Sequence, residues 1–303
     1  MPTEYQYFTA TDDIISTKTL LHEAIPMTGA IYKFETGSYV EENIKNFSHG
    51  QFQSVYDYPY LSSSANHIFD LSVGFDEASE FSGSNTIQNA KKINMYNSMA
   101  QVLLGYSKVG ADHVNEFVER FESDLNVTDN SRHMKEVFFV NFSRLLTKDQ
   151  IKKGSFSITL ATGSWTDAVT AGSVLTLADH EASADSGFKS MVGGDYGLLY
   201  TASSPIVADS IAYGNIFYQA GIAVITSSIF ENAANQGTGS KHPERAAFSI
   251  QNGDLGQTHK TIQQSFTGSA ISGTCNAIRH RITNIAFNNT TEINSKIYFC
   301  RVP

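Results

Sequence analysis

Cysteine is scarce in this chain, which has only Cys275 and Cys300, far apart and outside any paired motif. Two such residues do not make a disulfide framework, so both are expected to be buried free thiols. The sequence also lacks any run of about 18 apolar residues, the length that a membrane-spanning helix needs. Because the first residues lack a basic segment and apolar run like those of a signal peptide, we expect cytoplasmic synthesis and no membrane contact.

Charge is sparse as well, since charged residues make up 17% of the 303 residues, against roughly 25% in an average soluble domain. Two interpretations remain open: a surface largely covered by neighbouring molecules, or a β-rich monomer with uncharged polar loops. The net charge of −9 argues against nucleic-acid binding, which needs a cationic surface. The few basic clusters are interpreted as solvated turns or strand ends: Lys91-Lys92, Lys152-Lys153 and Arg279-His280-Arg281.

Local motifs of site chemistry are missing. No zinc-type spacing of His and Cys, no Gly-x-Ser-x-Gly and no phosphate-binding glycine loop occurs. A calcium-like start at Asp124 fails because Asp129 replaces the required glycine and Lys135 the required glutamate. We therefore predict no catalytic, cofactor-binding or metal-binding residues. A carboxylate pair assembled in three dimensions remains the enzyme alternative, and Glu41, Glu42, Glu77 and Glu80 are interpreted as loop acids.

Residues 213–230 are rich in apolar residues and contain no charged residue. Their β-branched and aromatic residues predict two short strands about a Gln219-Ala220-Gly221 turn. We expect this pair to be buried in the core, with Ile222, Val224 and Ile225 away from solvent and from partners.

Helical signals are confined to the middle of the chain. Ser84, Asn85 or Thr86 can cap a helix whose apolar face holds Ile93, Tyr96, Ala100 and Leu103, and which ends before Gly105. A second helix is predicted over residues 112–125, because its apolar residues follow the i, i+3, i+4, i+7 spacing. One further helical turn is expected at 147–151, broken at Gly154.

Short strands separated by turns account for most of the remaining chain. Residues 137–142 fit a helix or a strand, and their composition favours a strand. The other predicted strands are 68–73, 155–160, 174–177, 196–200, 246–250, 279–287 and 296–302. This spacing is typical of a sandwich or barrel.

The predicted fold is thus α+β and mainly β, with a β-sandwich or barrel-like core and a short helical insertion at about 84–126. Residues 1–30 are assigned to an extended N-terminal arm and residues 31–303 to a single domain. Pro26 keeps the arm extended. A partner-binding arm and an ordinary edge strand both fit this segment.

Four phrases give the sequence a family resemblance. They are STKTLLHEAIP at 16–26, FSHGQFQSVYDYPYL at 47–61, NFSRLL at 141–146 with KKGSFS at 152–157, and GNIFYQAG at 214–221. Together they resemble a family of virion structural proteins in contractile-tailed phages of marine bacteria, chiefly cyanophages. The resemblance implies a multi-copy component of the tail or baseplate, with neck or head as the alternative station, and it supplies no catalytic residues.

We therefore expect a non-enzymatic subunit of the virion whose partners are other virion proteins and copies of itself. A rival hypothesis is a receptor- or glycan-binding module of the tail, in which exposed aromatic residues stack on host-surface sugars. Its candidate residues are Tyr56, Tyr58, Tyr60 and Trp165. A wall-degrading hydrolase is the third, and we expect no such activity.

Overall fold

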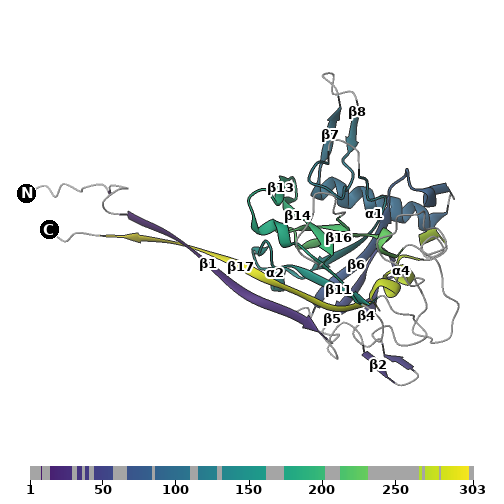
Figure 1. Ribbon diagram of the computed structural model, residues 1–303, viewed down its shortest axis with the longest axis horizontal. Helices are drawn as coiled ribbons and strands as arrows, with labels where there is room; N and C mark the ends of the chain where they lie inside the picture. Colours follow the sequence, from purple (N-terminus) through teal and green to yellow (C-terminus); the bar gives the residue numbers. More distant parts are fainter. Residues whose placement is uncertain are drawn as a thin grey trace, which may run out of the picture.

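The structure is a computed structural model that is mainly β, as predicted. It describes residues 8, 14–28, 33–35, 38–40, 44–56, 67–83, 86–109, 115–127, 132–161, 174–201, 212–230, 266–267, 270–279 and 281–299. A rounded body carries one long two-stranded ribbon, which projects to one side and ends near both chain termini (Figure 1). Residues 246–250, for which a strand was predicted, lie outside the described part of the chain.

One antiparallel sheet runs through the body and into the ribbon. In sheet order its strands are β1 (Ile14–Thr28), β17 (Ile282–Tyr298), β11 (Ser157–Ala161), β12 (Val174–Ala178), β14 (Gly194–Thr201), β15 (Gly214–Phe217), β16 (Ile222–Thr226), β9 (Glu136–Phe142), β6 (His67–Phe75), β5 (Gln53–Tyr56) and β4 (Ile44–Asn46). Two further strands join it at the side, β10 (Gln150–Ile151) on β17 and β13 (Phe188–Met191) on β14.

Two small hairpins and several helices complete the described elements. The hairpins pair β2 (Lys33–Glu35) with β3 (Ser38–Val40), and β7 (Tyr106–Val109) with β8 (Asn115–Val118). The α-helices are α1 (Ile87–Leu103), α2 (Arg144–Thr147) and α4 (Ile271–Arg279), and the 3-10 helices are η2 (Glu80–Gly83), η5 (His180–Ser183) and η6 (Ser227–Phe230).

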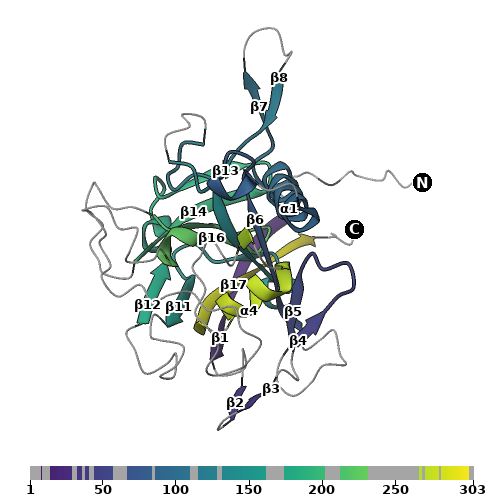
Figure 2. The ribbon, with the colours of Figure 1, turned by 90° about the vertical axis from the view of Figure 1, so that its right-hand side faces the viewer.

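The sheet curls so that strands far apart in sheet order share one core. The ring of Phe142 on β9 lies 5.7 Å from that of Phe156 and 5.2 Å from that of Phe287 on β17. In the end-on view of Figure 2, α4 lies between the β11–β17 part of the sheet and β4–β5. Its buried Cys275, a free thiol as predicted, donates to the carbonyl of Leu71 (3.4 Å). The inner face is barrel-like, while the pairings of the described strands run from β1 to β4 without closing.

The prediction of a buried strand pair within residues 213–230 is confirmed, and its separation from partners stays a prediction. Strands β15 and β16 pair about a turn that Gly221 closes with φ +69°. Ile225 faces the inner core, whereas Val224 faces the second core beneath α1, and both are fully buried. Both faces of this strand pair are buried, which explains why its sequence contains no charged residue.

Helix α1 also matches its prediction. The Thr86 hydroxyl accepts a hydrogen bond from the amide of Asn89 (3.2 Å), and Gly105 follows the helix with φ +92°. The helix packs tightly across β6, since a Cβ on Gly74 would lie 2.8 Å from the amide nitrogen of Tyr96. A glycine is therefore required where helix and strand cross.

The prediction of a second helix over residues 112–125 is wrong. Residues 115–118 form strand β8, and 119–127 are not helical. Phe121, which the helical spacing placed on an apolar stripe, is instead fully buried with its ring 5.4 Å from that of Tyr96 and 5.7 Å from that of Phe139. Tertiary packing of one aromatic ring thus overrides a local periodicity, and the described helical part of the insertion is α1 alone.

Three boundaries also differ from the prediction. The helical turn near 147–151 lies at Arg144–Thr147, and Lys148 ends it with φ +55°. Residue 279 ends helix α4 and does not start a strand. The two strands predicted at 279–287 and 296–302 are one strand, β17, from Ile282 to Tyr298. Pairing with β1 along its whole length carries β17 through the polar residues that separated the two predictions.

The prediction that the basic clusters are solvated is wrong for three of their residues, because Lys92, Arg279 and Arg281 are buried. Arg279 donates to Gln53 Oε1 (3.1 Å) and Asn276 Oδ1 (3.2 Å), and Lys92 donates to the carbonyl of Phe266. Burial lowers the pKa of Arg281 to about 10 and that of Lys92 to about 8. These long side chains reach polar acceptors inside the fold, which charge patterning along the chain does not reveal.

The buried lysine predicts an alkaline rise in stability. Because burial lowers the pKa of Lys92 from 10.5 to about 8, the folded chain binds fewer protons than the unfolded chain between these values. The free energy of unfolding should therefore increase with pH in this window, by up to about 1.4 kcal/mol per pH unit. Urea unfolding between pH 7.5 and 9.5 measures the slope. In Lys92→Met the slope should be smaller, and an unchanged slope would contradict the assignment.

Candidate functional site

The residues singled out from the sequence do not gather into one site. Tyr56 is half-buried on β5, and Glu77 and Glu80 are exposed, as loop acids should be. Tyr58, Tyr60, Trp165, Glu41 and Glu42 lie outside the described residues. Within the described ranges, no group of three or more His, Cys, Asp and Glu side chains is placed to hold a metal ion.

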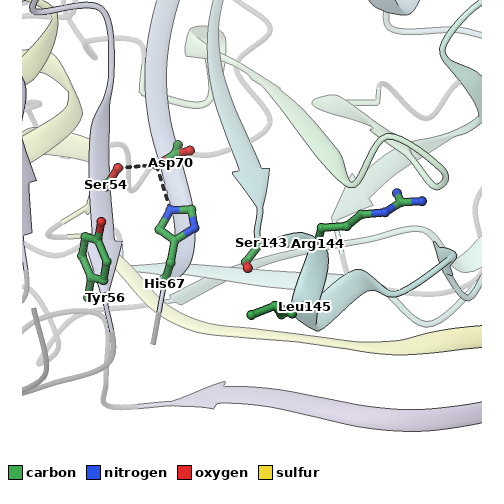
Figure 3. Close-up of a pocket in the computed structure, with 7 residues that line it drawn as sticks. All are labelled: Ser54, Tyr56, His67, Asp70, Ser143, Arg144 and Leu145. Atoms are coloured by element: carbon green, nitrogen blue, oxygen red, sulfur yellow. Dashed lines mark hydrogen bonds and ion pairs between the residues drawn. The ribbon is translucent and has the colours of Figure 1, made fainter. Parts of the chain in front are cut away.

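A shallow pocket of about 370 Å³ opens at the end of β5 and β6. Figure 3 shows the seven residues that line it: Ser54, Tyr56, His67, Asp70, Ser143, Arg144 and Leu145. Ser54 and Asp70 face each other across the two strands. A register shift after Val55 pairs Tyr56 with His67, which brings that histidine to the same face as Asp70. The pocket thus arises from strand register, which no local motif encodes.

The pocket contains Ser, His and Asp but not in the order of a catalytic triad. Ser54 Oγ donates to Asp70 Oδ1 (2.5 Å), and His67 Nε2 lies 2.8 Å from the same oxygen. In a triad the histidine stands between serine and aspartate, where it takes the serine proton. Here the carboxylate stands in the middle, so the histidine does not activate the serine.

The Arg144 side chain points away from this cluster (Figure 3). Its guanidinium donates to the carbonyls of Gln219 (2.6 Å) and Asp149 (3.4 Å), where it fastens the 218–221 turn to α2. The pocket therefore contains a hydrogen-bonded Ser-Asp-His cluster, and Arg144 at its rim makes hydrogen bonds to the backbone of neighbouring loops.

A second polar cluster surrounds the same turn. The fully buried Asp179 accepts hydrogen bonds from the amides of Gly154 (2.8 Å) and Phe156 (2.9 Å) and from the hydroxyl of Tyr218 (2.9 Å). Burial raises the pKa of the Asp179 carboxyl, although these donors act in the opposite direction. The carboxylate joins the start of β11 to the turn after β15, which is a structural role.

Asp195 lies on the other side of Tyr218. It pairs with Lys153 (2.6 Å) and accepts a hydrogen bond from Ser190. Burial favours the neutral acid, but the hydrogen bonds from Lys153 and Ser190 outweigh it and hold the pKa of Asp195 below its usual value. The ion pair of Asp195 with Lys153 joins β14 to the segment that precedes β11.

The paired strands β1 and β17 form a ribbon that projects from the body (Figure 1). Its fifteen residue pairs run from Ile14 with Tyr298 to Thr28 with Asn284. At the root, β17 also pairs with β11 and β10, and the amide of Glu292 donates to Asp149 Oδ2 (2.7 Å). Beyond the root, no other described strand pairs with residues 14–21 or 291–298. The eight pairs from Ile14–Tyr298 to Leu21–Thr291 span about 26 Å at the usual strand rise.

The projecting part has two different faces, because side chains alternate along each strand. We call one the neutral face: Ile15, Thr17, Thr19, Leu21, Thr291, Ile293, Ser295 and Ile297. The other is the charged face: Ile14, Ser16, Lys18, Leu20, Glu292, Asn294, Lys296 and Tyr298. On the charged face Lys18 and Glu292 form an ion pair (2.5 Å). On the neutral face no residue carries a charge.

The neutral face is the continuation of a core face. Toward the body the next row on this side of the ribbon is the exposed Glu23 with Asn289, followed by Ile25 with Phe287, which pack in the inner core. Outward, its large apolar residues remain 43–51% exposed: Ile15, Leu21, Ile293 and Ile297. Leu20 and Tyr298 of the charged face are about half exposed too. The edge-strand interpretation describes β1, which ends the sheet. β1 also projects beyond the body as part of the ribbon, and partner binding by this segment stays a prediction.

Comparisons of the chain with models of known families, with curated proteins and with solved structures give no match. In the part of the chain that the structure describes, no helix is long and apolar enough to cross a membrane.

Proposed function

We propose that this protein is a non-enzymatic structural subunit of a multi-copy assembly, and that the β1–β17 ribbon holds neighbouring subunits together. The observation that carries the proposal is the exposure of apolar side chains along a ribbon that leaves the body. Contiguous exposed apolar surface is rare on soluble monomers and marks interaction sites. Among the described strands, none pairs with the outer edges of β1 and β17 beyond the root, and free strand edges invite pairing with another chain.

The energy of such a contact is substantial for so small an element. Leu20 and Leu21 are each about half exposed in the isolated chain. Covering the exposed half of a leucine stabilises an interface by roughly 0.8–1.5 kcal/mol. The ribbon offers several such residues on two strands that are already paired with each other, which lowers the ordering entropy lost on binding.

The family resemblance supports placing this assembly in the tail or baseplate of a contractile-tailed phage virion, made in the host cytoplasm. Two of the four phrases contribute residues around the 218–221 turn: the amide of Phe142 donates to the carbonyl of Gly221 (2.9 Å), and Gly154 is linked to Tyr218 through Asp179. The phrase at 16–26 lies in β1. The resembling residues thus include the ribbon as well as the scaffold at the centre of the body.

Weakening the ribbon tests the proposal. In Leu20→Ser with Leu21→Ser, one residue of each face loses its apolar side chain, so self-association or particle incorporation should fall at least tenfold, about 1.4 kcal/mol or more. Sedimentation velocity of the purified chain and its recovery on assembled particles measure this. The control is Ile87→Ser, which removes an exposed side chain of α1 on the body. A wild-type chain that stays monomeric and never appears on particles would refute the function.

Electron microscopy of whole particles labelled through this subunit tests the station. Label at the tail end supports the tail or baseplate, and label at the neck or head supports the alternative. Label on fibres that bind host cells would support the receptor-binding hypothesis instead.

A further inference from the structure

We infer that the pocket at the end of β5 and β6 binds one ring of a neutral sugar, with Asp70 and Ser143 as hydrogen-bonding groups and Tyr56 as the apolar surface. The proposed function uses the ribbon and leaves this pocket without a role. The free polar atoms of the pocket, its charge and its apolar side all fit this class of ligand.

Three polar atoms of the pocket make no hydrogen bond to the described part of the chain. Ser54 and His67 both bond to Asp70 Oδ1, which leaves Asp70 Oδ2 as an open acceptor. The Nδ1 atom of His67 and the hydroxyl of Ser143 are open as well. The side chains of His67 and Asp70 are 21% and 23% exposed, so a ligand can reach them. A carboxylate oxygen and a neutral imidazole nitrogen both require donors, and the serine hydroxyl can donate or accept.

The charge of the pocket favours a neutral ligand. The carboxylate of Asp70 repels an anion. Arg144 stands at the rim, and its guanidinium bonds to carbonyl groups and to no carboxylate among the described residues, so its positive charge remains. The formal charges of Asp70 and Arg144 cancel, and a proton on His67 would oppose a bound cation further. A neutral ligand with several hydroxyl groups satisfies the open atoms without adding charge.

The pocket also has an apolar side. Tyr56 lines it from β5, across from Leu145 of α2 (Figure 3). The Tyr56 ring is half-buried, with its centroid 5.4 Å from that of His67, and Leu145 is 54% exposed. Apolar walls with a few placed polar groups are usual for small-molecule sites. A sugar ring matches both parts, because its C–H face packs on an aromatic ring while its hydroxyl groups donate and accept hydrogen bonds.

The size of the pocket limits the ligand to a small one. Its volume of about 370 Å³ lies near the lower end of the roughly 300–1,000 Å³ of small-molecule sites. One sugar ring fits such a volume, and the shallow shape leaves the rest of a glycan chain outside. A hexose has only about 12 non-hydrogen atoms, so we expect a dissociation constant on the order of 1 mM for a single sugar.

NMR titration of the full chain with a panel of neutral hexoses and pentoses tests the inference. We expect at least one sugar to bind, and Asp70→Asn should weaken its binding at least tenfold through loss of a charge-assisted hydrogen bond. The matched control is Asp185→Asn, which removes the same charge from an exposed residue outside the pocket and should leave binding unchanged.

A second variant guards against misfolding of Asp70→Asn. Ser143→Ala removes a hydroxyl that makes no hydrogen bond to the described residues, so the fold should remain. Its sugar binding should still fall by about threefold or more. The unfolding midpoint of each variant, measured by circular dichroism, shows whether the fold is kept.

Each other outcome overturns the inference. Binding of no sugar in the panel means that the pocket does not take this class of ligand. Sugar binding that is equal in the wild type, Asp70→Asn and Ser143→Ala means that the sugar binds elsewhere. Binding of lysine amide in place of the sugars, lost in Asp70→Asn, means that the pocket takes a cation. The ribbon is tested separately, since a monomeric chain that binds the sugar would support this inference and refute the proposed function.

Discussion

Replacing Asp179 with alanine is expected to lower the free energy of unfolding by about 3–5 kcal/mol, because it leaves two buried donors and one partly buried donor without their acceptor. The donors are the amides of Gly154 and Phe156 and the hydroxyl of Tyr218, each within 2.9 Å of the carboxylate. Urea unfolding followed by far-ultraviolet circular dichroism measures the loss.

Two variants separate the lost acceptor from a general loss of packing. Tyr218→Phe removes one donor and keeps the ring, so it should cost only about 1 kcal/mol. Asp179→Asn keeps one acceptor oxygen and should lie between Tyr218→Phe and Asp179→Ala. If Asp179→Ala is no less stable than Tyr218→Phe, the carboxylate does not join β11 to the central turn as described.

Replacing Phe142 with alanine should be as damaging, with a loss of about 3–5 kcal/mol from the cavity and the lost apolar contact. The Phe142 ring lies 6.1 Å from that of Phe69, 5.7 Å from that of Phe156 and 5.2 Å from that of Phe287. These rings come from both ends of the curled sheet and from the root of the ribbon. Hydrogen exchange should therefore accelerate at the β17 root as well as in β9.

The matched control for this variant is Phe8→Ala, which removes the same side chain from a residue that is 51% exposed. Its free energy of unfolding should change by no more than about 0.5 kcal/mol. Equal unfolding midpoints for the two variants would mean that Phe142 does not hold the two parts of the sheet together.

The candidate sites were hidden from sequence reasoning for a physical reason. Ser54 and Asp70 are sixteen residues apart and meet through the register of β5 and β6, while a shift in that register turns His67 toward them. Motif searches detect spacing along the chain, and this spacing is set across strands. The buried cations were misjudged for the same reason, since the acceptor of Lys92 is the carbonyl of Phe266, 174 residues away.

What the sequence by itself determined was the class of each strongly patterned element. The uncharged β-branched run at 214–226 could only be stable as buried strands, and the capped stripe after Thr86 could only be stable as a helix ending before Gly105. Both signals are local, because propensity and capping act within a few residues.

Tertiary structure alone decided the rest. Residues 119–127 are not helical although their apolar spacing favours a helix, because the Phe121 ring packs between Tyr96 of α1 and Phe139 of the sheet. It also joined β1 to β17, elements more than 250 residues apart, and carried them past the body as one ribbon. Long-range pairing gains its free energy only after the chain has brought distant segments together. The surface on which the proposed assembly depends is therefore a property of the fold and not of any single stretch of sequence.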